Sequence, residues 1–169
     1  MPVIELSTYI NAPVSRCFDL ARSIDLHKIS TKGTDEEAIA GVTKGLINAG
    51  QYVTWSAWHF GFRQTLTSGI TRFRAPYYFR DEMIAGPFKS IVHDHRFIPS
   101  GDGTLVQNWF HFESPGGILG MAFNRVVLTD YLRRVLLRRN EVVKAYAEGE
   151  GWTKILNEGV LTEDIKGHL

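Results

Sequence analysis

The sequence predicts a single α+β domain in which a curved antiparallel sheet of seven strands surrounds a long C-terminal helix. Three patterns support this fold class. Apolar and polar residues alternate near the start, residues 37–113 are rich in Thr, Val and aromatic residues broken by Gly and Pro, and residues 119–148 repeat apolar residues at helical spacing. The predicted order is strand, two short helices, six strands and one long helix, so the helix must cover one face of the sheet.

Residues 3–10 are predicted to form the first strand, because apolar and polar residues alternate along them. The side chains expected to face inward are Ile4, Leu6, Thr8 and Ile10. Pro13 suits the first turn of a helix, where a backbone N–H is not needed. Ser23 and Asp25 are expected to divide residues 14–29 into two short helices.

Six further strands are predicted at 37–41, 51–60, 62–74, 77–84, 88–98 and 104–113. They are separated by Gly61, by the pairs Ala75-Pro76 and Gly86-Pro87, and by a loop at 99–103. Links this short join antiparallel neighbours, because parallel neighbours need a crossover of a dozen or more residues. The six strands therefore form a meander without helical crossovers.

A long helix is predicted from Leu119 to Glu148, with apolar residues recurring every three or four positions along one side. The opposite side is expected to carry the basic residues Arg125, Arg133, Arg134, Arg138, Arg139 and Lys144. Gly149 and Gly151 are expected to end the helix. Residues 149–169 are predicted to be a tail that forms no separate domain and has no assigned function.

Composition excludes several classes of protein. The 169 residues include 19 Lys and Arg against 18 Asp and Glu, so there is no excess positive charge that would favour nucleic-acid binding. Cys17 is the single cysteine, which excludes an intrachain disulfide and disfavours a cysteine-based zinc site. The first ten residues do not have the pattern of a signal peptide, and no apolar run is long enough to span a bilayer. We expect a cytoplasmic protein.

The layout itself predicts an internal cavity. A strongly bent sheet that grips a helix leaves space between the two, because a straight helix cannot touch every part of the curve. Such cavities are typically lined by apolar side chains with a few polar groups that orient a ligand.

The chain resembles the START/Bet v 1-like (SRPBCC) superfamily, whose architecture is called the helix-grip fold, and within it a bacterial polyketide cyclase/dehydrase-like ligand-binding branch. The similar stretches are 4–27, 45–61, 66–71, 76–88, 93–97, 103–120 and 131–140. The resemblance implies that residues 1–148 form a domain with a cavity for apolar or amphipathic small molecules. Members of this branch often carry an acidic residue where this chain has Asn108, so the resemblance does not support a catalytic carboxylate there.

The stretch IVHDHRF at 91–97 places His93 and His95 on the same face of a predicted strand. If residues 99–102 form the hairpin loop, His95 pairs with Val106 and Phe97 with Thr104, the two histidines face inward, and Asp94 and Arg96 face water. A loop one residue shorter would reverse these directions. We favour the inward arrangement, since it also buries Phe97.

Two inward histidines admit a metal site, a catalytic pair or a polar patch in a cavity wall. Further metal donors would have to come from His59, Asp81, Glu82 or His111 on other strands. Zinc sites in proteins need three or four protein ligands, and the sequence contains no second clear pair. We therefore predict no metal and no cofactor.

The residues predicted to contact a ligand are polar and aromatic side chains of the strands together with one residue of the helix. They are Trp55, His59, Phe79, Glu82, His93, His95, Phe97, Asn108, Phe110 and Phe123. If the protein is an enzyme, the catalytic candidates are His93 and Glu82, acting as an acid–base pair, with Asp81 as the alternative carboxylate.

The predicted function is the binding of a small hydrophobic or amphipathic molecule, for carriage or sensing, and the chain is more simply a binding protein than an enzyme. One alternative is a cyclase or dehydratase that uses a histidine and a carboxylate in the same cavity. Another is a protein-interaction module without a ligand. Peripheral membrane contact through the basic helix face and a homodimer are further predicted partners, and nucleic acid is not.

Overall fold

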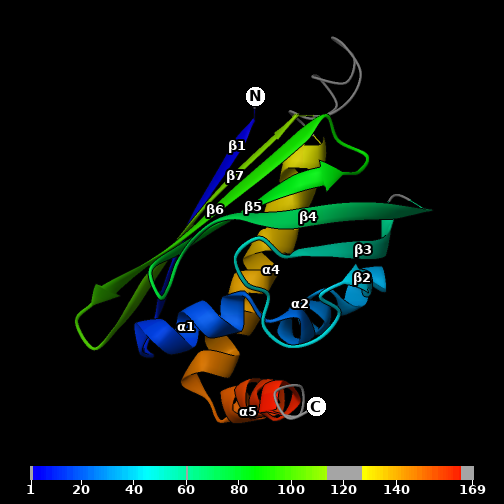
Figure 1. Cartoon of the computed structure of the whole chain (residues 1–169). Helices are drawn as coiled ribbons and strands as arrows, with labels where there is room; N and C mark the ends of the chain where they lie inside the picture. Colours follow the sequence, from blue (N-terminus) through cyan, green and yellow to red (C-terminus); the bar gives the residue numbers. More distant parts are fainter. Residues whose placement is uncertain (1, 60, 114–126, 165–169) are drawn as a thin grey trace.

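Figure 1 shows the computed structural model, which describes residues 2–59, 61–113 and 127–164. The N-terminal part contains one strand and two short helices. The remaining strands follow in a meander, and two helices complete the described part of the chain. The elements are β1 (Val3–Ile10), α1 (Val14–Ala21), α2 (Ile24–Ser30), the 3₁₀ turn η1 (Lys32–Thr34), β2 (Glu37–Gly41), β3 (Tyr52–His59), β4 (Phe62–Arg74), β5 (Tyr78–Ala85), β6 (Ser90–Ser100), β7 (Gly103–Glu113), α4 (Thr129–Glu148) and α5 (Gly151–Asp164).

The seven strands form one antiparallel sheet in the order β1-β7-β6-β5-β4-β3-β2. Strands β2 to β7 are the predicted meander, and β1 pairs with β7 at the other edge, with Val3 opposite His111. The sheet curves around α4, which runs along its inner face (Figure 1). The predicted α+β class and helix-grip architecture are confirmed.

The first strand and the two short helices form as predicted. Ile4, Leu6 and Ile10 of β1 are buried, which confirms the alternation along this strand. The hydroxyl of Ser23 accepts a hydrogen bond from the backbone N–H of Leu26 over 3.2 Å and so caps the start of α2. Ser23 therefore separates the two helices because its side chain replaces a backbone partner that the new helix lacks.

The hairpin between β6 and β7 differs from the predicted pairing. Ser100 pairs with Gly103, so that only Gly101 and Asp102 form the turn, and Gly101 adopts a left-handed φ of 56°. As a result His95 pairs with Asn108, not Val106, and Phe97 pairs with Val106, not Thr104. The shift moves the partner by an even number of residues, so the predicted direction of the side chains survives.

The core consists of two apolar clusters on the inner face of the sheet. One is centred on Phe18 of α1, which makes edge-to-face contacts with Phe79 and Phe97. The other joins Ile4, Phe112 and Leu136 near the start of α4. Helix α4 contributes to both clusters and thus connects the two ends of the domain.

Helix α4 ends at Glu148 before Gly149, as predicted. Its predicted beginning at Leu119 lies outside the described residues. The segment predicted to be a tail contains a helix, α5, which packs against α1 and α4. The guanidinium of Arg16 lies 4.1 Å above the ring of Trp152, and Ile155 and Leu156 pack against the larger core cluster.

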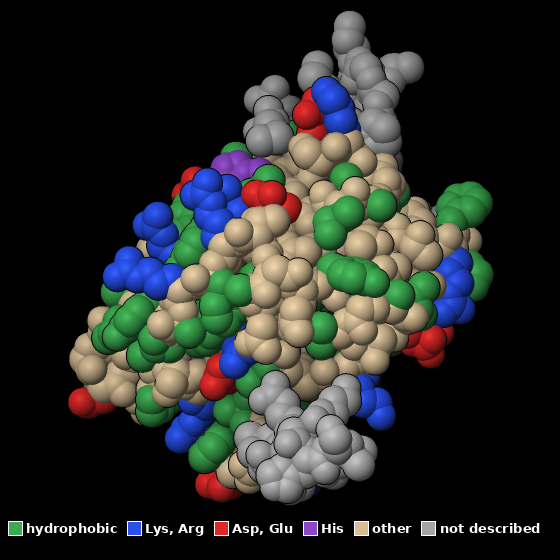
Figure 2. Space-filling model, in the orientation of Figure 1, with side chains coloured by type: hydrophobic (Ala, Val, Ile, Leu, Met, Phe, Trp, Pro, Cys, Tyr) green, Lys and Arg blue, Asp and Glu red, His purple; other side chains and the backbone are tan. Residues whose placement is uncertain are grey.

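Within the described part of the chain, no helix combines the length and hydropathy that a bilayer crossing requires. The face of the molecule in Figure 2 carries hydrophobic side chains scattered among basic and acidic ones. The large hydrophobic side chains at the surface include Trp58 and Phe62 beside the turn between β3 and β4, where Phe62 is 71% exposed.

Candidate functional site

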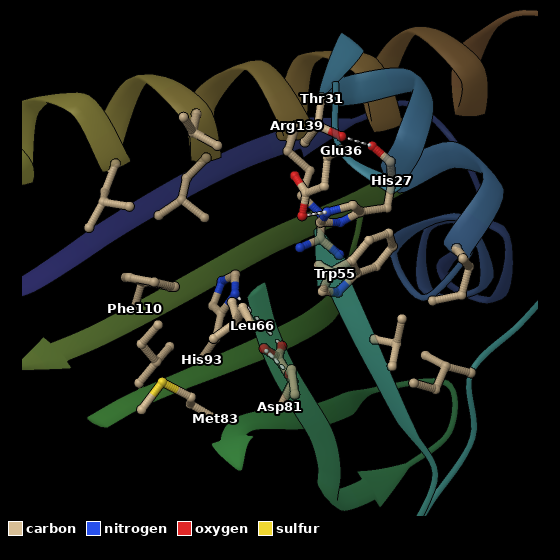
Figure 3. Close-up of a pocket in the computed structure, with 18 of the residues that line it drawn as sticks. His27, Thr31, Glu36, Trp55, Leu66, Asp81, Met83, His93, Phe110 and Arg139 are labelled. Atoms are coloured by element: carbon tan, nitrogen blue, oxygen red, sulfur yellow. Dashed lines mark hydrogen bonds and ion pairs between the residues drawn. The ribbon is translucent and has the colours of Figure 1, made fainter. Parts of the chain in front are cut away.

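A cavity of about 200 Å³ lies between the inner face of the sheet, α2 and α4 (Figure 3). Most of its wall is apolar. The sheet supplies Leu66, Ile70, Met83 and Phe110, and α4 supplies Leu132 and Leu136. The strands alternate their side chains between two faces, so every second residue of β4, β5 and β6 reaches this space. The cavity that the layout predicted is present.

Two polar side chains on the α2 side of the cavity were not predicted from the sequence. The ring of His27 in α2 stacks on the ring of Trp55 with 4.1 Å between their centroids, and its Nε2 is 3.2 Å from Oε1 of Glu36. Burial lowers the pKa of His27. Burial alone would raise the pKa of Glu36, but the charges of His27, His59 and Arg139 and the hydrogen bond from His27 lower it. Glu36 is therefore a carboxylate that the cavity wall stabilises.

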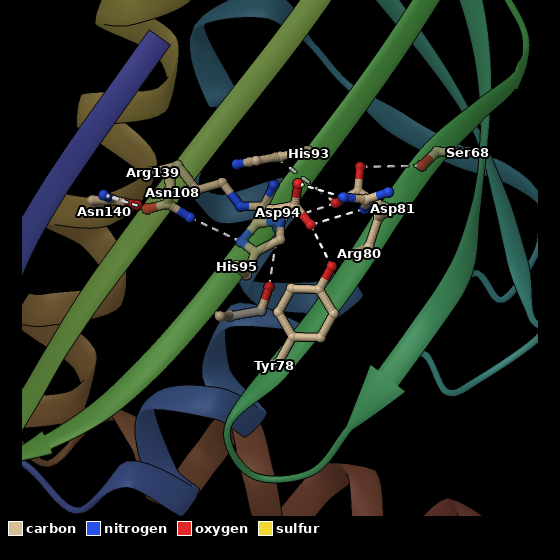
Figure 4. A network of polar contacts seen from close by, with 11 residues as sticks. Ser68, Tyr78, Arg80, Asp81, His93, Asp94, His95, Asn108, Arg139 and Asn140 are labelled. Carbon is tan, nitrogen blue, oxygen red and sulfur yellow. Dashed lines mark hydrogen bonds and ion pairs between the residues drawn. The ribbon is translucent and has the colours of Figure 1, made fainter. Parts of the chain in front are cut away.

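A second group of polar side chains is organised around His95 (Figure 4). The amide nitrogen of Asn108 donates to Nδ1 of His95 over 2.9 Å, and therefore the proton of the neutral ring sits on Nε2. That N–H donates to Oδ2 of Asp81 over 2.9 Å. Ser68 donates to the other oxygen of Asp81 over 3.3 Å. The side-chain amide of Asn140 in α4 donates to the side-chain oxygen Oδ1 of Asn108 over 2.9 Å, which links the helix to the sheet.

His93 differs from its neighbour because its Nε2 has no hydrogen-bond partner among the residues that the structure describes, although only 2% of the residue is exposed. Its Nδ1 is 3.7 Å from Oδ2 of Asp81, beyond hydrogen-bonding distance. Burial, followed by the charge of His95, holds the pKa of His93 well below its ordinary value. Burial does the same to the pKa of His95. Both rings are therefore neutral near pH 7.

Arg139 of α4 reaches into the cavity. This differs from the sequence-based prediction, which places it on the exposed basic side of the helix. Its Nη2 donates to the carbonyl oxygen of Ala21 over 2.9 Å, and no carboxylate of the described residues lies within ion-pair distance of it. Burial lowers the pKa of Arg139, against the opposing charges of Asp81 and Glu36. A helical register that places Leu132, Leu136 and Val143 inward also places Arg139 inward, and this was the missed signal.

The structure brings together only part of the predicted ligand-contacting set. Trp55, His59, Phe79, His93 and Phe110 line the cavity. His95 and Asn108 lie behind this wall and line a small adjoining void of about 10 Å³. His59 also contacts Tyr131 of α4, with 2.7 Å between Nδ1 and the hydroxyl oxygen.

Of the predicted residues that the structure describes, Phe97 and Glu82 do not line the cavity. Phe97 lies in the core, where its ring stacks at 5.9 Å on Phe79. Phe123 lies outside the described residues. The side chain of Glu82 lies on the outer face of the sheet and pairs with Arg80 at 3.5 Å, because β5 alternates and its neighbour Asp81 is the one that points inward. The prediction of Glu82 as the carboxylate partner of His93 is therefore wrong.

Asp94 was expected in water but is half-buried on the outer face. It accepts hydrogen bonds from Tyr78 and, through both of its oxygens, from Arg80 at 2.8 and 2.9 Å (Figure 4). Hydrogen bonds from Arg80 and Tyr78 outweigh the effect of burial and lower the pKa of Asp94. The two hydrogen bonds between Arg80 and Asp94 join β5 to β6 on the face of the sheet opposite the two histidines.

Asp81, His93 and His95 have candidate ligand atoms within 4.8 Å of one another. In this arrangement Nε2 of His95 donates its proton to Asp81, and Nδ1 accepts from Asn108. Both nitrogens of His95 are thus committed to protein partners, and the cluster is accounted for by hydrogen bonding. The absence of a metal stays a prediction from the sequence.

Comparisons with known proteins agree with this architecture. Residues 1–148 match the family model described as polyketide cyclase / dehydrase and lipid transport. The crystal structure of TTHA0849 from Thermus thermophilus is similar with a TM-score of 0.68 and 22% identity, over 86% of this chain and 99% of that one. The major latex-like protein 151 of Panax ginseng has a TM-score of 0.63 and 18% identity, over 88% and 98%.

The structure of Ara h 8.0201 is also similar, with a TM-score of 0.61 and 12% identity over 86% of this chain and 97% of that one. No curated protein matches the chain. At these identities the structural neighbours establish the fold alone. Together with the family match they confirm the resemblance to the SRPBCC superfamily predicted from the sequence.

Proposed function

Since the chain belongs to the polyketide cyclase / dehydrase and lipid transport family, we propose that it binds a small apolar or amphipathic molecule, for carriage or sensing, in the cavity between the sheet and α4. The observation that carries this proposal is the wall itself. Large apolar side chains from β4, β5, β6, β7 and α4 enclose a space of about 200 Å³ with a few polar groups among them. This combination is typical of a ligand pocket.

The physical basis of binding is the removal of apolar surface from water. Each square ångström of apolar surface buried contributes about 25 cal/mol, so a ligand that covers the wall at Leu66, Met83 and Phe110 gains several kcal/mol from contact alone. Polar groups such as His93 and Arg139 then fix its orientation rather than supply most of its affinity.

The test combines two measurements. Native mass spectrometry of protein purified from cells is expected to show a retained small-molecule mass. After that ligand is removed, the neutral fluorescent probe N-phenyl-1-naphthylamine is expected to bind, and the variant Leu132→Trp, which fills the cavity from α4, should weaken binding at least tenfold. Leu137→Trp on the exposed face of the same helix is the matched control and should bind normally. Equal binding by both variants would rule out this cavity.

A second candidate function is acid–base catalysis in the same cavity, and the geometry of His93 favours it. Nδ1 of His93 lies 3.7 Å from a carboxylate oxygen of Asp81, and Nε2 has no hydrogen-bond partner within the described ranges, so one ring nitrogen faces a carboxylate and the other is open to a substrate. Of the two carboxylates predicted as partners of His93, this candidate uses Asp81 and not Glu82. Incubating a metabolite extract with wild-type protein and with His93→Ala, followed by mass spectrometry, tests it. A species that loses the mass of water only with wild-type protein supports a dehydratase or cyclase.

The remaining predicted properties rest on surface features. Arg133, Arg134 and Arg138 are exposed on α4 and would provide the basic face for peripheral membrane contact. Trp58 and Phe62 are exposed and would serve a homodimer or an interaction module. Sedimentation with anionic vesicles and the oligomeric state in solution test these two proposals. A cytoplasmic location is likewise proposed from the sequence.

A further inference from the structure

We infer that the ligand carries a carboxylate head group and that Arg139 binds this group inside the cavity. The inference rests on the proposed ligand-binding function and specifies the chemical class of the ligand. Its starting point is the position of the guanidinium, which enters the cavity from α4 in Figure 3 and reaches the space beside His93 in Figure 4.

Arg139 has more hydrogen-bond donors than the protein uses. A guanidinium has five N–H donors and no acceptor. Among the described residues, its single hydrogen bond runs to the carbonyl oxygen of Ala21. A buried charge destabilises the folded state unless it is paired and hydrogen-bonded. The residue is therefore explained if a bound molecule completes its partners with acceptor oxygens.

The acidic side chains of the cavity are already engaged. Glu36 is within hydrogen-bonding distance of His27, and Asp81 accepts hydrogen bonds from His95 and Ser68. Their charges oppose an anion, so the preference depends on direct contact with the guanidinium of Arg139. The other cation in the wall, Arg22, is paired with Asp19 at 2.8 Å and also donates to Asn48. Arg139 is thus the cation left to bind a ligand within the described wall.

His93 provides a second, independent observation at the same place. It is 2% exposed, it lines the cavity, and no residue of the described part of the chain forms a hydrogen bond with its Nε2. His93 and Arg139 also both line the adjoining void of about 10 Å³, which shows that the two groups converge. The imidazole nitrogen can donate or accept according to its tautomer, and so it can bond an oxygen or a hydroxyl of the head group.

A carboxylate matches this pair of groups better than a neutral polar head. Its two oxygens lie in one plane at a spacing that fits the guanidinium fork, and charge-assisted bonds of this type are about twice as strong as neutral ones. The apolar body of the ligand then lies against Leu66, Met83 and Phe110, on the side of the cavity away from Arg139 (Figure 3).

The experiment measures equilibrium dissociation constants by calorimetry for matched sets of probes on the full chain. One set is decanoate, decanamide and 1-decanol, and the other is 2-naphthoate, 2-naphthamide and 2-naphthalenemethanol. We expect the carboxylate of at least one set to bind tenfold or more tightly than its neutral partners, since a hydrogen bond between two charged groups is stronger than one to a neutral group. Arg139→Met should abolish this preference while it retains the neutral probes.

Three further measurements separate an effect on ligand binding from an effect on folding or on charge alone. Arg138→Met, one position away on the exposed face of α4, should keep the full preference for the carboxylate. The ligand-free Arg139→Met protein should melt at or above the wild-type temperature, because an apolar side chain replaces a partly buried charge that has no carboxylate partner among the described residues. Arg139→Lys should recover part of the preference, since it restores the charge without the fork.

The outcomes distinguish this inference from the proposed function. Neutral probes that bind as tightly as the carboxylates, or a preference that survives Arg139→Met, would overturn the inference and leave the ligand cavity intact. If N-phenyl-1-naphthylamine and all six probes fail to bind, the proposed function itself is wrong. A carboxylate preference that disappears with Arg139→Met, returns in part with Arg139→Lys and is kept by Arg138→Met establishes the head-group site.

Discussion

His95 donates from Nε2 to the carboxylate of Asp81 over 2.9 Å, and the direction of this bond is fixed from the opposite side of the ring. Asn108 donates to Nδ1, and Asn140 in turn donates to Asn108. A chain of hydrogen bonds therefore runs from α4 through β7 and β6 to β5. Asn140 also donates to the hydroxyl of Thr8 over 3.1 Å. His95, however, relies on Asn108 and Asp81 for both of its ring nitrogens, so the removal of either one leaves a buried group unsatisfied.

The first prediction concerns the middle of this chain. Asn108→Leu removes the donor to His95 and the acceptor for Asn140, both in a buried position. We expect the free energy of unfolding to fall by about 1–3 kcal/mol, because unsatisfied buried polar groups lose their hydration without replacement. Urea denaturation measures it. Gln107→Leu, on the same strand but the other face, should change stability by less than about 0.5 kcal/mol.

The second prediction separates the two neighbouring carboxylates of β5. Asp81→Ala should lower the free energy of unfolding by about 1–3 kcal/mol, because the N–H of His95 loses its acceptor in a buried position. Glu82→Ala removes only a partly exposed pair with Arg80 and should cost about 0–1 kcal/mol. Equal losses in urea denaturation would contradict the assignment of Asp81 to the inner face.

The third prediction concerns pH. Burial lowers the pKa of His27, His93 and His95, so the unfolded chain binds more protons than the folded chain at pH values between the folded pKa values and about 6.5. Stability therefore rises with pH through this window and is lost as pH falls below about 6.5. Each histidine that stays neutral contributes a slope of about 1.4 kcal/mol per pH unit.

Urea titrations at pH 7, 6 and 5 check this prediction. His93→Leu removes one of the histidines whose pKa is lowered by burial, and its stability should fall less steeply with acid than that of the wild type. A variant with the same slope as the wild type would show that His93 is protonated in the folded protein.

The fourth prediction concerns α5. Trp152→Ala removes the ring that lies 4.1 Å from the guanidinium of Arg16 and part of the contact with the core. We expect the free energy of unfolding to fall by about 1–2 kcal/mol from lost apolar burial and the lost cation–π contact. Lys154→Ala, exposed on the same helix, should leave the melting temperature unchanged. A silent Trp152→Ala would mean that α5 adds nothing to the domain.

The sheet was the most predictable part of the protein, because period-two alternation fixes which side chains share a face. His93 and His95 face inward as predicted, and both are 2% exposed. The pairing partner of His95 was wrong, however, because the length of the turn at Gly101 sets the register and Gly–Asp–Gly segments fit more than one turn. The direction survived only because the error was an even number of residues.

The cavity walls were less predictable than the fold. Arg139 was placed in water because basic residues are rarely buried, although its spacing from Leu136 and Val143 placed it on the apolar stripe. Sequence alone does not tell which of Glu82 and Asp81 faces the cavity, since two neighbouring acids on one strand point to opposite faces and the register of the strand decides which one is inward. His27 and Glu36 come from different elements, and nothing local in the sequence predicts their contact.

The pairing of β1 with β7 has a consequence for biosynthesis. Val3 lies opposite His111 and Ile10 opposite Thr104, so β1 can pair only after β7, about a hundred residues later in the chain, has been synthesised. While the ribosome adds the intervening chain, β1 has no partner in the final sheet. Closure of such a distant pair is slow compared with local hairpins. The nascent chain thus exposes the apolar face of β1, formed by Ile4, Leu6 and Ile10, until β7 emerges.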